Sequence, residues 1–243
     1  MTALPFSYHI RRSARAGRVR VIVSHGRVEV VAPVKVAERR IHQFVEEKAH
    51  WISRTLAKLA ARAEQDIRFA PVNFEDGEQL LCQGQALTLS VQRTNNKRIK
   101  IERSDALIVY LPDAVFKAPQ RQTVIKSALQ VWLKKQLKSE VEAIIDRHGK
   151  ALGLVPTAIR IKAQKSRWGS CSARNNININ WLLALAPQPV LEYVVVHELC
   201  HIQVKNHSPA FWDLVALHLP EYRQPRQWLK THGAGLMQAF HNG

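Results

Sequence analysis

With 243 residues, 46% of them hydrophobic, and three scattered cysteines, the chain can bury a sizeable core, and both a disordered protein and a disulfide framework are excluded. No apolar run approaches the roughly 18 residues that cross a bilayer, and residues 1–20 lack the apolar segment of a secretory signal, so we expect a cytoplasmic protein. The formal net charge of +17 suits a polyanion partner such as a nucleotide or nucleic acid, although basic residues that merely coat solvated helices would give the same excess.

The first part of the chain predicts a hairpin followed by a helix. Residues 19–24 and 27–31 have the pattern of strands, and Ser-His-Gly at 24–26 suits the turn between them. Hydrophobic residues then recur at helical spacing from Val36 to about Glu64. We therefore expect one amphipathic helix packed on a sheet.

Two further hairpins are expected next, because short strand-like segments flank polar turns. The paired segments are 79–82 with 86–91 and 98–102 with 106–111. Prolines then mark a boundary within residues 112–119. We place a β-rich N-terminal part at residues 1–114 and a catalytic part at 115–243, although the two could form one continuous domain.

The C-terminal part is expected to be mainly helical around a small sheet, which makes the whole chain an α+β protein. Hydrophobic periodicity, prolines at helix starts and glycines at helix ends place its elements. They are a long helix to about His148 with Gly149 as its stop, strands at 158–163 and 177–181, and helices at 187–204, from Ser208-Pro209 to about Leu217, and at 222–231 before Gly233.

The segment 197–201, which reads His-Glu-Leu-Cys-His, decides the expected chemistry. Positions four apart on an α-helix differ by about 40° around the axis, so His197 and His201 project from one face and can reach one metal ion. Glu198 lies beside that face and can approach a metal-bound water without being a ligand. This is the His-Glu-x-x-His pattern of zinc hydrolases. Two surface histidines and a solvated glutamate are the alternative, which the apolar residues at 191–196 oppose.

A catalytic zinc site needs a third protein ligand and one open position. His207 lies six residues after His201, just before the next helix starts, so the intervening turn could return it to the metal. A loop histidine with local hydrogen bonds is the alternative, and we favour His207 as the third ligand. Rival third ligands are Asp213, Glu221 and His218.

These residues resemble the YgjP-like metallopeptidase family, which is related to the SprT-type zinc proteases. Beyond the helix motif, the resemblance includes the segments 206–212, 165–172, 179–181 and 219–222, and it extends over most of the chain. One position departs from the pattern, because Cys200 stands where a small residue such as Ala is expected. A thiol so close to zinc could be sensitive to oxidation.

The resemblance implies a zincin-like catalytic part in which His197, His201 and His207 bind zinc and Glu198 is the general base. Zinc lowers the pKa of bound water to about 7, and the resulting hydroxide attacks a carbonyl that the metal polarises. Glu198 takes the proton of the water and passes it to the leaving amine. A peptide or protein is then the expected substrate.

Other marked residues have less certain roles. Arg167 could bind a substrate carboxylate or phosphate, and Arg167 and Tyr222 are both candidates for stabilising the oxyanion. Residues 176–181 could be an edge strand that pairs with a substrate backbone or an interior strand of the small sheet. The aromatic side chains are expected in the core; they are Trp168, Phe211, Trp212 and Trp228.

Two other functions remain open from the sequence. The basic surface would suit a metal-dependent nucleotide pyrophosphatase, although the chain has neither a Gly-x-x-x-x-Gly-Lys loop nor an acidic cluster for magnesium. A nucleic-acid-associated protein with structural zinc is the third reading. Glu198 opposes it, because a structural zinc site needs no base and closes with four protein ligands.

Overall fold

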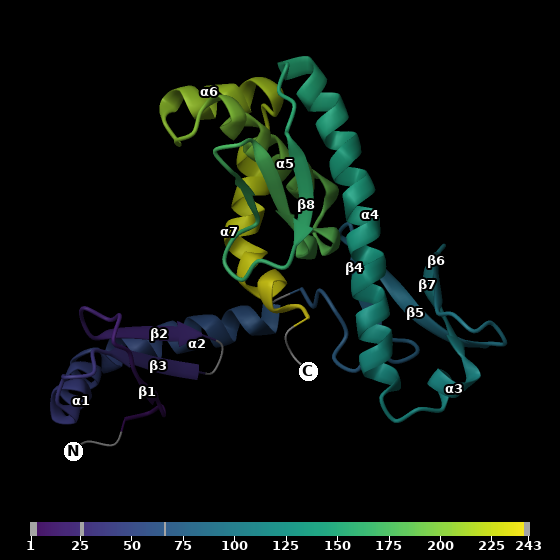
Figure 1. The fold of residues 1–243 in the computed structure, drawn as a ribbon. Helices are drawn as coiled ribbons and strands as arrows, with labels where there is room; N and C mark the ends of the chain where they lie inside the picture. Colours follow the sequence, from purple (N-terminus) through teal and green to yellow (C-terminus); the bar gives the residue numbers. More distant parts are fainter. Residues whose placement is uncertain (1–3, 25–26, 66, 241–243) are drawn as a thin grey trace. The chain divides into compact units, whose positions relative to one another are not determined.

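The computed structural model describes residues 4–24, 27–65 and 67–240 (Figure 1). Its internal contacts divide the chain into two compact units, residues 1–66 and 67–243, each with its own hydrophobic core. Strands and helices occur in both units, so the α+β prediction is confirmed. In the described part of the chain, none of the helices combines the length and the apolar character needed to cross a bilayer.

The first unit is a three-stranded sheet packed with two helices. Its elements are β1 (His9–Arg12), β2 (Arg20–Ser24), β3 (Arg27–Ala32), α1 (Glu38–Glu47) and α2 (Ala49–Gln65). The predicted hairpin is confirmed by the antiparallel pairing of β2 with β3, while residues 25–26 of its turn lie outside the described residues. The expected single helix is divided at Lys48. This break lets Ile41 and Val45 of α1 and Ile52 of α2 reach one shared core.

The second unit begins with a four-stranded sheet in the order β4-β5-β7-β6. Its strands are β4 (Gln79–Cys82), β5 (Gln85–Thr94), β6 (Lys100–Arg103) and β7 (Ala106–Pro112). Both predicted hairpins are confirmed, because β4 pairs antiparallel with β5 and β6 with β7. The parallel pairing of β5 with β7 joins them into one sheet.

A short helix α3 (Asp113–Phe116) leads into the long helix α4 (Arg121–Leu152). The prediction that α4 stops at Gly149 is wrong, because the helix continues to Leu152 and is capped by Gly153, whose φ of 63° lies in the left-handed region. Glycine is required at position 149 for a different reason. A Cβ atom there would lie 2.7 Å from the carbonyl oxygen of Leu154, so glycine permits the returning chain to pack closely.

The four-stranded sheet of the second unit packs with the C-terminal elements. Internal contacts therefore divide the chain near residue 66, whereas the boundary expected from the sequence is at residue 114. α4 contacts β6 on one side and β8 (Ala158–Lys162) and α5 (Gln188–Gln203) on the other (Figure 1). The turn after β4 also binds the 3-10 helix η1 (Trp181–Leu185), since the N–H groups of Gln83 and Gly84 donate to Ala184 and Leu185. Shared hydrophobic burial therefore joins the four-stranded sheet to the helical part.

The second sheet of this unit has the order β8-β10-β9, with β9 at Gly169–Cys171 and β10 at Asn176–Asn180. β10 lies between β8 and β9, so residues 176–180 form an interior strand, and the edge-strand hypothesis for them is wrong. The edge strand that contacts α5 is β9.

Two more helices follow α5, namely α6 (Pro209–His218) and α7 (Arg223–Gln238). The prediction that the last helix closes at Gly233 is wrong, because α7 continues past it. Gly233 is buried, and a Cβ atom there would lie 3.3 Å from the indole of Trp168. Both misread glycines therefore permit close packing inside a helix.

Candidate metal centre

The metal-binding motif lies on a helix that is buried along most of its length. Residues 190, 191, 193–196 and 198–200 of α5 are all buried, and the helix contacts α4, α6, α7 and β9. His197 and His201 stand one turn apart in its second half, as their spacing predicts. A helix held on several sides gives these side chains a rigid base.

The structure brings His197, His201 and His207 together. Their ligand atoms all lie within 4.8 Å of one another, and Nε2 of His197 is 3.1 Å from Nε2 of His207. Nδ1–H of His201 donates to the carbonyl oxygen of Val204 at 2.9 Å, which leaves the Nε2 lone pair of His201 free for a metal. The turn after α5 therefore returns His207 to the helix face.

Aromatic rings pack on two of the histidines, and a local turn helps to place His207. Trp212 stacks on His207 with ring centroids 5.8 Å apart, and Phe211 stacks on His201 at 4.4 Å. The side chain of Asn206 accepts a hydrogen bond from the backbone of Ser208, which shapes the turn before α6. Across the described residues, the one group of side chains able to hold a metal contains none of the rivals, which are Asp213, Glu221 and His218.

The three imidazoles fit a zinc ion. Burial, together with the neighbouring rings of His201 and His207, lowers the pKa of His197 to about 3, so this ring is neutral at physiological pH. The Nε2 atoms of His197 and His207 are 3.1 Å apart, so a cation bound between them can accept the lone pairs of both nitrogens. Neutral nitrogen ligands without a thiolate or a bridging carboxylate suit zinc in a catalytic site.

Glu198 is almost completely buried, with 5% of its surface exposed. Burial raises the pKa of its carboxyl group to about 7, while the charge of Arg167 and a hydrogen bond from the backbone of Cys171 act in the opposite direction. A carboxylate with a pKa near neutrality can both accept and return a proton under physiological conditions. The side chain of Glu198 lies next to β9, where the absence of a side chain at Gly169 leaves room for it.

A cavity of about 430 Å³ opens beside His197 and Glu198. Three basic side chains, Arg167, Arg226 and Lys230, lie in its wall, and Glu198 is its one acidic lining residue among those the structure describes. The remaining lining residues are Trp168, Gly169, Tyr193, Val194 and Leu229. A negatively charged substrate is therefore electrostatically favoured next to the histidine cluster.

Comparison with known proteins gives the affiliation of the chain. The model of the YgjP-like metallopeptidase domain matches residues 17–232. The chain belongs to the YgjP-like metallopeptidase family. This confirms the resemblance found in the sequence and makes the protein a metal-dependent hydrolase.

One curated relative of this YgjP-like chain is the UTP pyrophosphatase of Escherichia coli (strain K12). The two are 35% identical over 89 residues, which make up 35% of this chain and 50% of the relative. The chain therefore spans about half the length of the curated relative it matches.

Sequence reasoning missed three residues of this YgjP-like site, which are Tyr193, Arg226 and Lys230. Tyr193 lies one turn before His197 on α5, with ring centroids 5.8 Å apart, and helical spacing alone could have indicated it. Arg226 and Lys230 are four residues apart on α7 and so share a face, but no pattern in the sequence shows that this face meets the motif helix.

The predicted oxyanion candidates differ in position. Arg167 lines the cavity, whereas Tyr222 does not. The ring of Tyr222 is buried in a stack between Tyr193 and Trp212, with centroids 6.5 and 5.5 Å away. The geometry therefore favours Arg167 and Tyr193 over Tyr222 as groups that meet a substrate.

The aromatic residues expected in the core divide into two kinds. Phe211 is fully buried, as expected, while Trp212 and Trp228 are half-buried and pack against the same core. Trp168 also packs against that core and at the same time lines the cavity. Cys200 is fully buried, and burial raises the pKa of its thiol to about 12, which opposes the expected sensitivity to oxidation.

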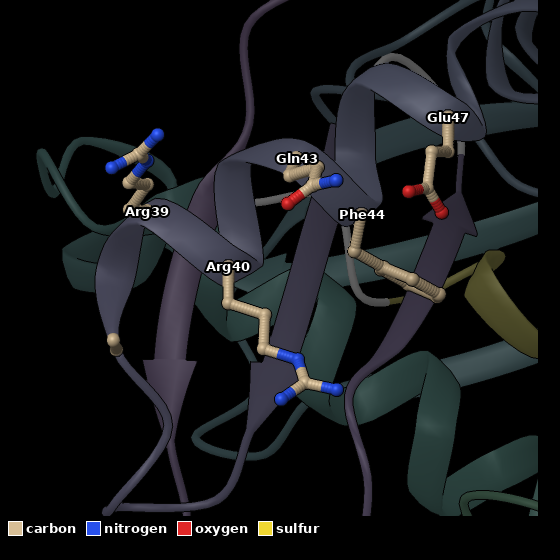
Figure 2. A pocket seen from close by; sticks show the side chains of 6 residues that line it. Arg39, Arg40, Gln43, Phe44 and Glu47 are labelled. Carbon is tan, nitrogen blue, oxygen red and sulfur yellow. The ribbon is translucent and has the colours of Figure 1, made fainter.

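The first unit contains a larger hollow, of about 610 Å³, along α1. Figure 2 shows Arg39, Arg40, Gln43, Phe44 and Glu47 projecting from this one helix. Its lining includes neither histidine nor cysteine, and its charges are of both signs. The residues that line this hollow therefore offer no imidazole or thiolate ligand, whereas the smaller cavity lies beside the histidine cluster.

Proposed function

We propose that the chain is a zinc-dependent pyrophosphatase of nucleoside triphosphates, with zinc held by His197, His201 and His207. The observation that carries the proposal is the charge of the cavity, because three basic side chains line the space that also contains Glu198. Arginine and lysine in a partly enclosed site bind phosphate oxygens through charge-assisted hydrogen bonds. The name of the E. coli relative supports the same substrate class.

The residues of the site have separate roles in the proposed hydrolysis of the phosphoanhydride. When bound, zinc supplies Lewis acidity and lowers the pKa of a coordinated water to about 7. Glu198 accepts a proton from the attacking water, whose oxygen forms a bond to the α-phosphorus. The bond from that phosphorus to its bridging oxygen breaks, and the electron pair leaves with pyrophosphate. The products are a nucleoside monophosphate and pyrophosphate.

The basic residues act on the substrate and on the leaving group. Arg167, Arg226 and Lys230 neutralise the triphosphate as it binds and the charge that grows on the departing pyrophosphate. Arg226 is itself oriented by Trp212, over whose ring its guanidinium lies at 4.3 Å. Tyr193 adds a donor, because burial raises its pKa to about 12 and keeps its hydroxyl protonated.

Peptide hydrolysis is the second candidate, and the sequence alone placed it first. The name of the family supports it, and so does β9, an edge strand next to Glu198 whose position suits pairing with an extended peptide. The same histidines and the same base would serve it. The two candidates differ in what the basic residues do, since an uncharged peptide gains little from them.

The test assays the zinc-loaded chain for pyrophosphate release from nucleoside triphosphates and for cleavage of a library of uncharged peptides. We expect Arg226→Ala and Lys230→Ala to raise KM for the triphosphate by about 10-fold each, and Glu198→Gln to lower kcat by about 100-fold or more while zinc is retained. Lys138→Ala, which removes an exposed charge from α4, is the control.

Each contrary outcome rejects a specific part of the proposal. Cleavage of peptides without turnover of triphosphates would reject the pyrophosphatase in favour of the peptidase. Salt-dependent binding of nucleic acid without turnover of either substrate would reject both hydrolases and favour a polyanion-binding protein. A fully active Glu198→Gln variant would exclude Glu198 as the base.

A further inference from the structure

Asn180, at the end of β10, is a polar side chain in the interior. Among the residues whose burial the structure describes, Asn180 and Glu198 are the two with polar or charged side chains that are buried, and Asn180 is fully inaccessible. Glu198 already has a place in the proposed chemistry, whereas Asn180 has none. A buried amide is costly unless its hydrogen bonds are made, so its partners indicate its purpose.

The amide of Asn180 is bonded at both ends. Its Nδ2 donates to the carbonyl oxygens of Gln164 at 2.8 Å and of Arg167 at 3.0 Å, and its Oδ1 accepts from the backbone of Leu182 at 3.2 Å. The backbone N–H of Asn180 donates to the carbonyl oxygen of Trp168 at 2.8 Å. Three of these four bonds reach the loop between β8 and β9.

This loop, residues 163–168, carries part of the cavity wall. Arg167 and Trp168 line the cavity, and Gly169, the next residue, lies against Glu198. Within the part of the chain that the structure describes, the hydrogen bonds to carbonyl groups of the loop all come from Asn180. The position of Arg167 therefore depends on one side chain that is not in the cavity.

We propose that Asn180 is a positioning residue for this site: its amide holds the loop 163–168 so that Arg167 stays in the wall of the cavity beside Glu198. The task assigned to Arg167 rests on the proposed function, but the dependence of the loop on Asn180 does not. Asparagine suits the position because one NH2 group can donate to two carbonyls while its oxygen accepts from a third group.

The decisive variant is Asn180→Asp, which has the same shape. Aspartate keeps an oxygen for the N–H of Leu182 but places an acceptor against the carbonyls of Gln164 and Arg167, so it acts on the loop. Asn178→Asp is the matched control, because it makes the same change on the same strand. Nδ2 of Asn178 donates to the side chain of Ser170 and not to the loop 163–168. If Asn180→Asp does not fold, Asn180→Ala replaces it.

The first measurement is hydrogen exchange of the zinc-loaded protein, which needs no assumption about the substrate. We expect peptides covering residues 163–169 to exchange at least about 10-fold faster in Asn180→Asp than in the wild type, while peptides of α5 and the zinc content stay unchanged. Asn178→Asp should leave the loop protected. Equal protection of the loop in Asn180→Asp and the wild type would overturn the proposal.

The second measurement is a double-mutant cycle with Arg167→Ala, read from kcat/KM for the triphosphate. We expect Asn180→Asp alone to lower kcat/KM by about 10-fold, mainly through KM, and to lower it less than about 2-fold when Arg167 is already alanine. Effects that simply multiply would show that Asn180 does not act through Arg167 and would overturn the proposal.

Failure of the proposed function can be distinguished from failure of this inference. If the wild type hydrolyses no triphosphate, the same cycle is measured on the binding of inorganic tripolyphosphate by calorimetry. If the wild type does not bind that probe either, the exchange of the loop alone decides. A loop that loosens in Asn180→Asp supports the positioning role, and one that stays protected rejects it.

Discussion

A Cβ atom at position 169 would lie 2.5 Å from Oε1 of Glu198 and 2.7 Å from its Cγ. No real Cβ contact is that short, so glycine is the residue that lets β9 pass over the buried carboxylate. The φ of Gly169 is not in the left-handed region, so the requirement comes from space and not from backbone conformation. The position of Glu198, the proposed general base, therefore depends on residue 169 having no side chain.

The first prediction follows from this contact. Gly169→Ala should push the Glu198 carboxylate out of its position and lower kcat by about 100-fold, as displacement of a catalytic group by about 1 Å commonly does. Zinc content should stay at the wild-type level, because the three histidines are not displaced. Kinetics and elemental analysis of the purified variant check both parts.

Gly17→Ala is the matched control for this substitution, since nothing lies within 4 Å of a Cβ atom at position 17. It should leave kcat unchanged. A Gly169→Ala variant with wild-type kcat would mean that Glu198 can move without loss of activity, which contradicts its assignment as the base.

The second prediction concerns the third histidine. His207→Ala should weaken zinc binding by more than about 100-fold, because the loss of an outer-shell partner alone commonly costs 10- to 100-fold. Competition with a chromophoric chelator measures the affinity. His50→Ala, at an exposed position of α2, is the control and should bind zinc like the wild type. Equal affinities in the two variants would remove His207 from the ligand set.

The sequence predicts those parts of the fold that local pattern determines. The hairpin of β4 and β5 and the helix that carries His197 follow from turns and periodicity within a few residues. The parallel pairing of β5 with β7 joins two hairpins over a longer distance, and no local signal specifies it. Gly149 and Gly233 were misread as helix ends, since a glycine that permits close packing looks the same in a sequence as one that ends a helix.

The candidate site shows the same limit. The pair His197 and His201 is set by the helical repeat, and His207 by a turn of a few residues, so the cluster could be predicted. Arg226 and Lys230 reach the cavity because α7 packs on α5, which is a tertiary contact between distant segments. Asn180 was read as part of a strand, because only its burial and its partners in the loop reveal a role.

The third prediction concerns the cysteines. Cys82 and Cys200 are buried, and burial raises the pKa of both thiols, so neither should react in the folded protein. Cys171 is partly exposed; burial raises the pKa of its thiol, while the charge of Lys205 lowers it. Under native conditions iodoacetamide should therefore label Cys171 at least about 10-fold faster than the other two.

Peptide mapping by mass spectrometry measures the labelling rates, and the protein unfolded in urea is the control in which all three cysteines should react. Fast native labelling of Cys200 would contradict the buried position of its side chain. It would also restore the expectation that this thiol is open to oxidation.

The last prediction is a pH dependence of the stability of the zinc-free protein. The pKa of His197 falls from 6.5 to about 3 on folding, so between these values the unfolded state binds more protons and acid destabilises the fold. The pKa of Glu198 rises from 4.5 to about 7, so between these values the folded state binds more protons and acid stabilises the fold. The two contributions oppose each other between about pH 4.5 and 6.5.

Glu198→Gln removes the second contribution and leaves the first. When zinc-free protein is acidified from pH 7 to 4.5, the variant should therefore lose stability relative to the wild type, by an amount of the order of 1–3 kcal/mol at about 1.4 kcal/mol per pKa unit. Urea unfolding at several pH values measures it, and Glu142→Gln, at an exposed position of α4, is the control. Parallel curves for Glu198→Gln and the wild type would show that the Glu198 carboxyl group has the same pKa folded and unfolded, which its burial beneath β9 opposes.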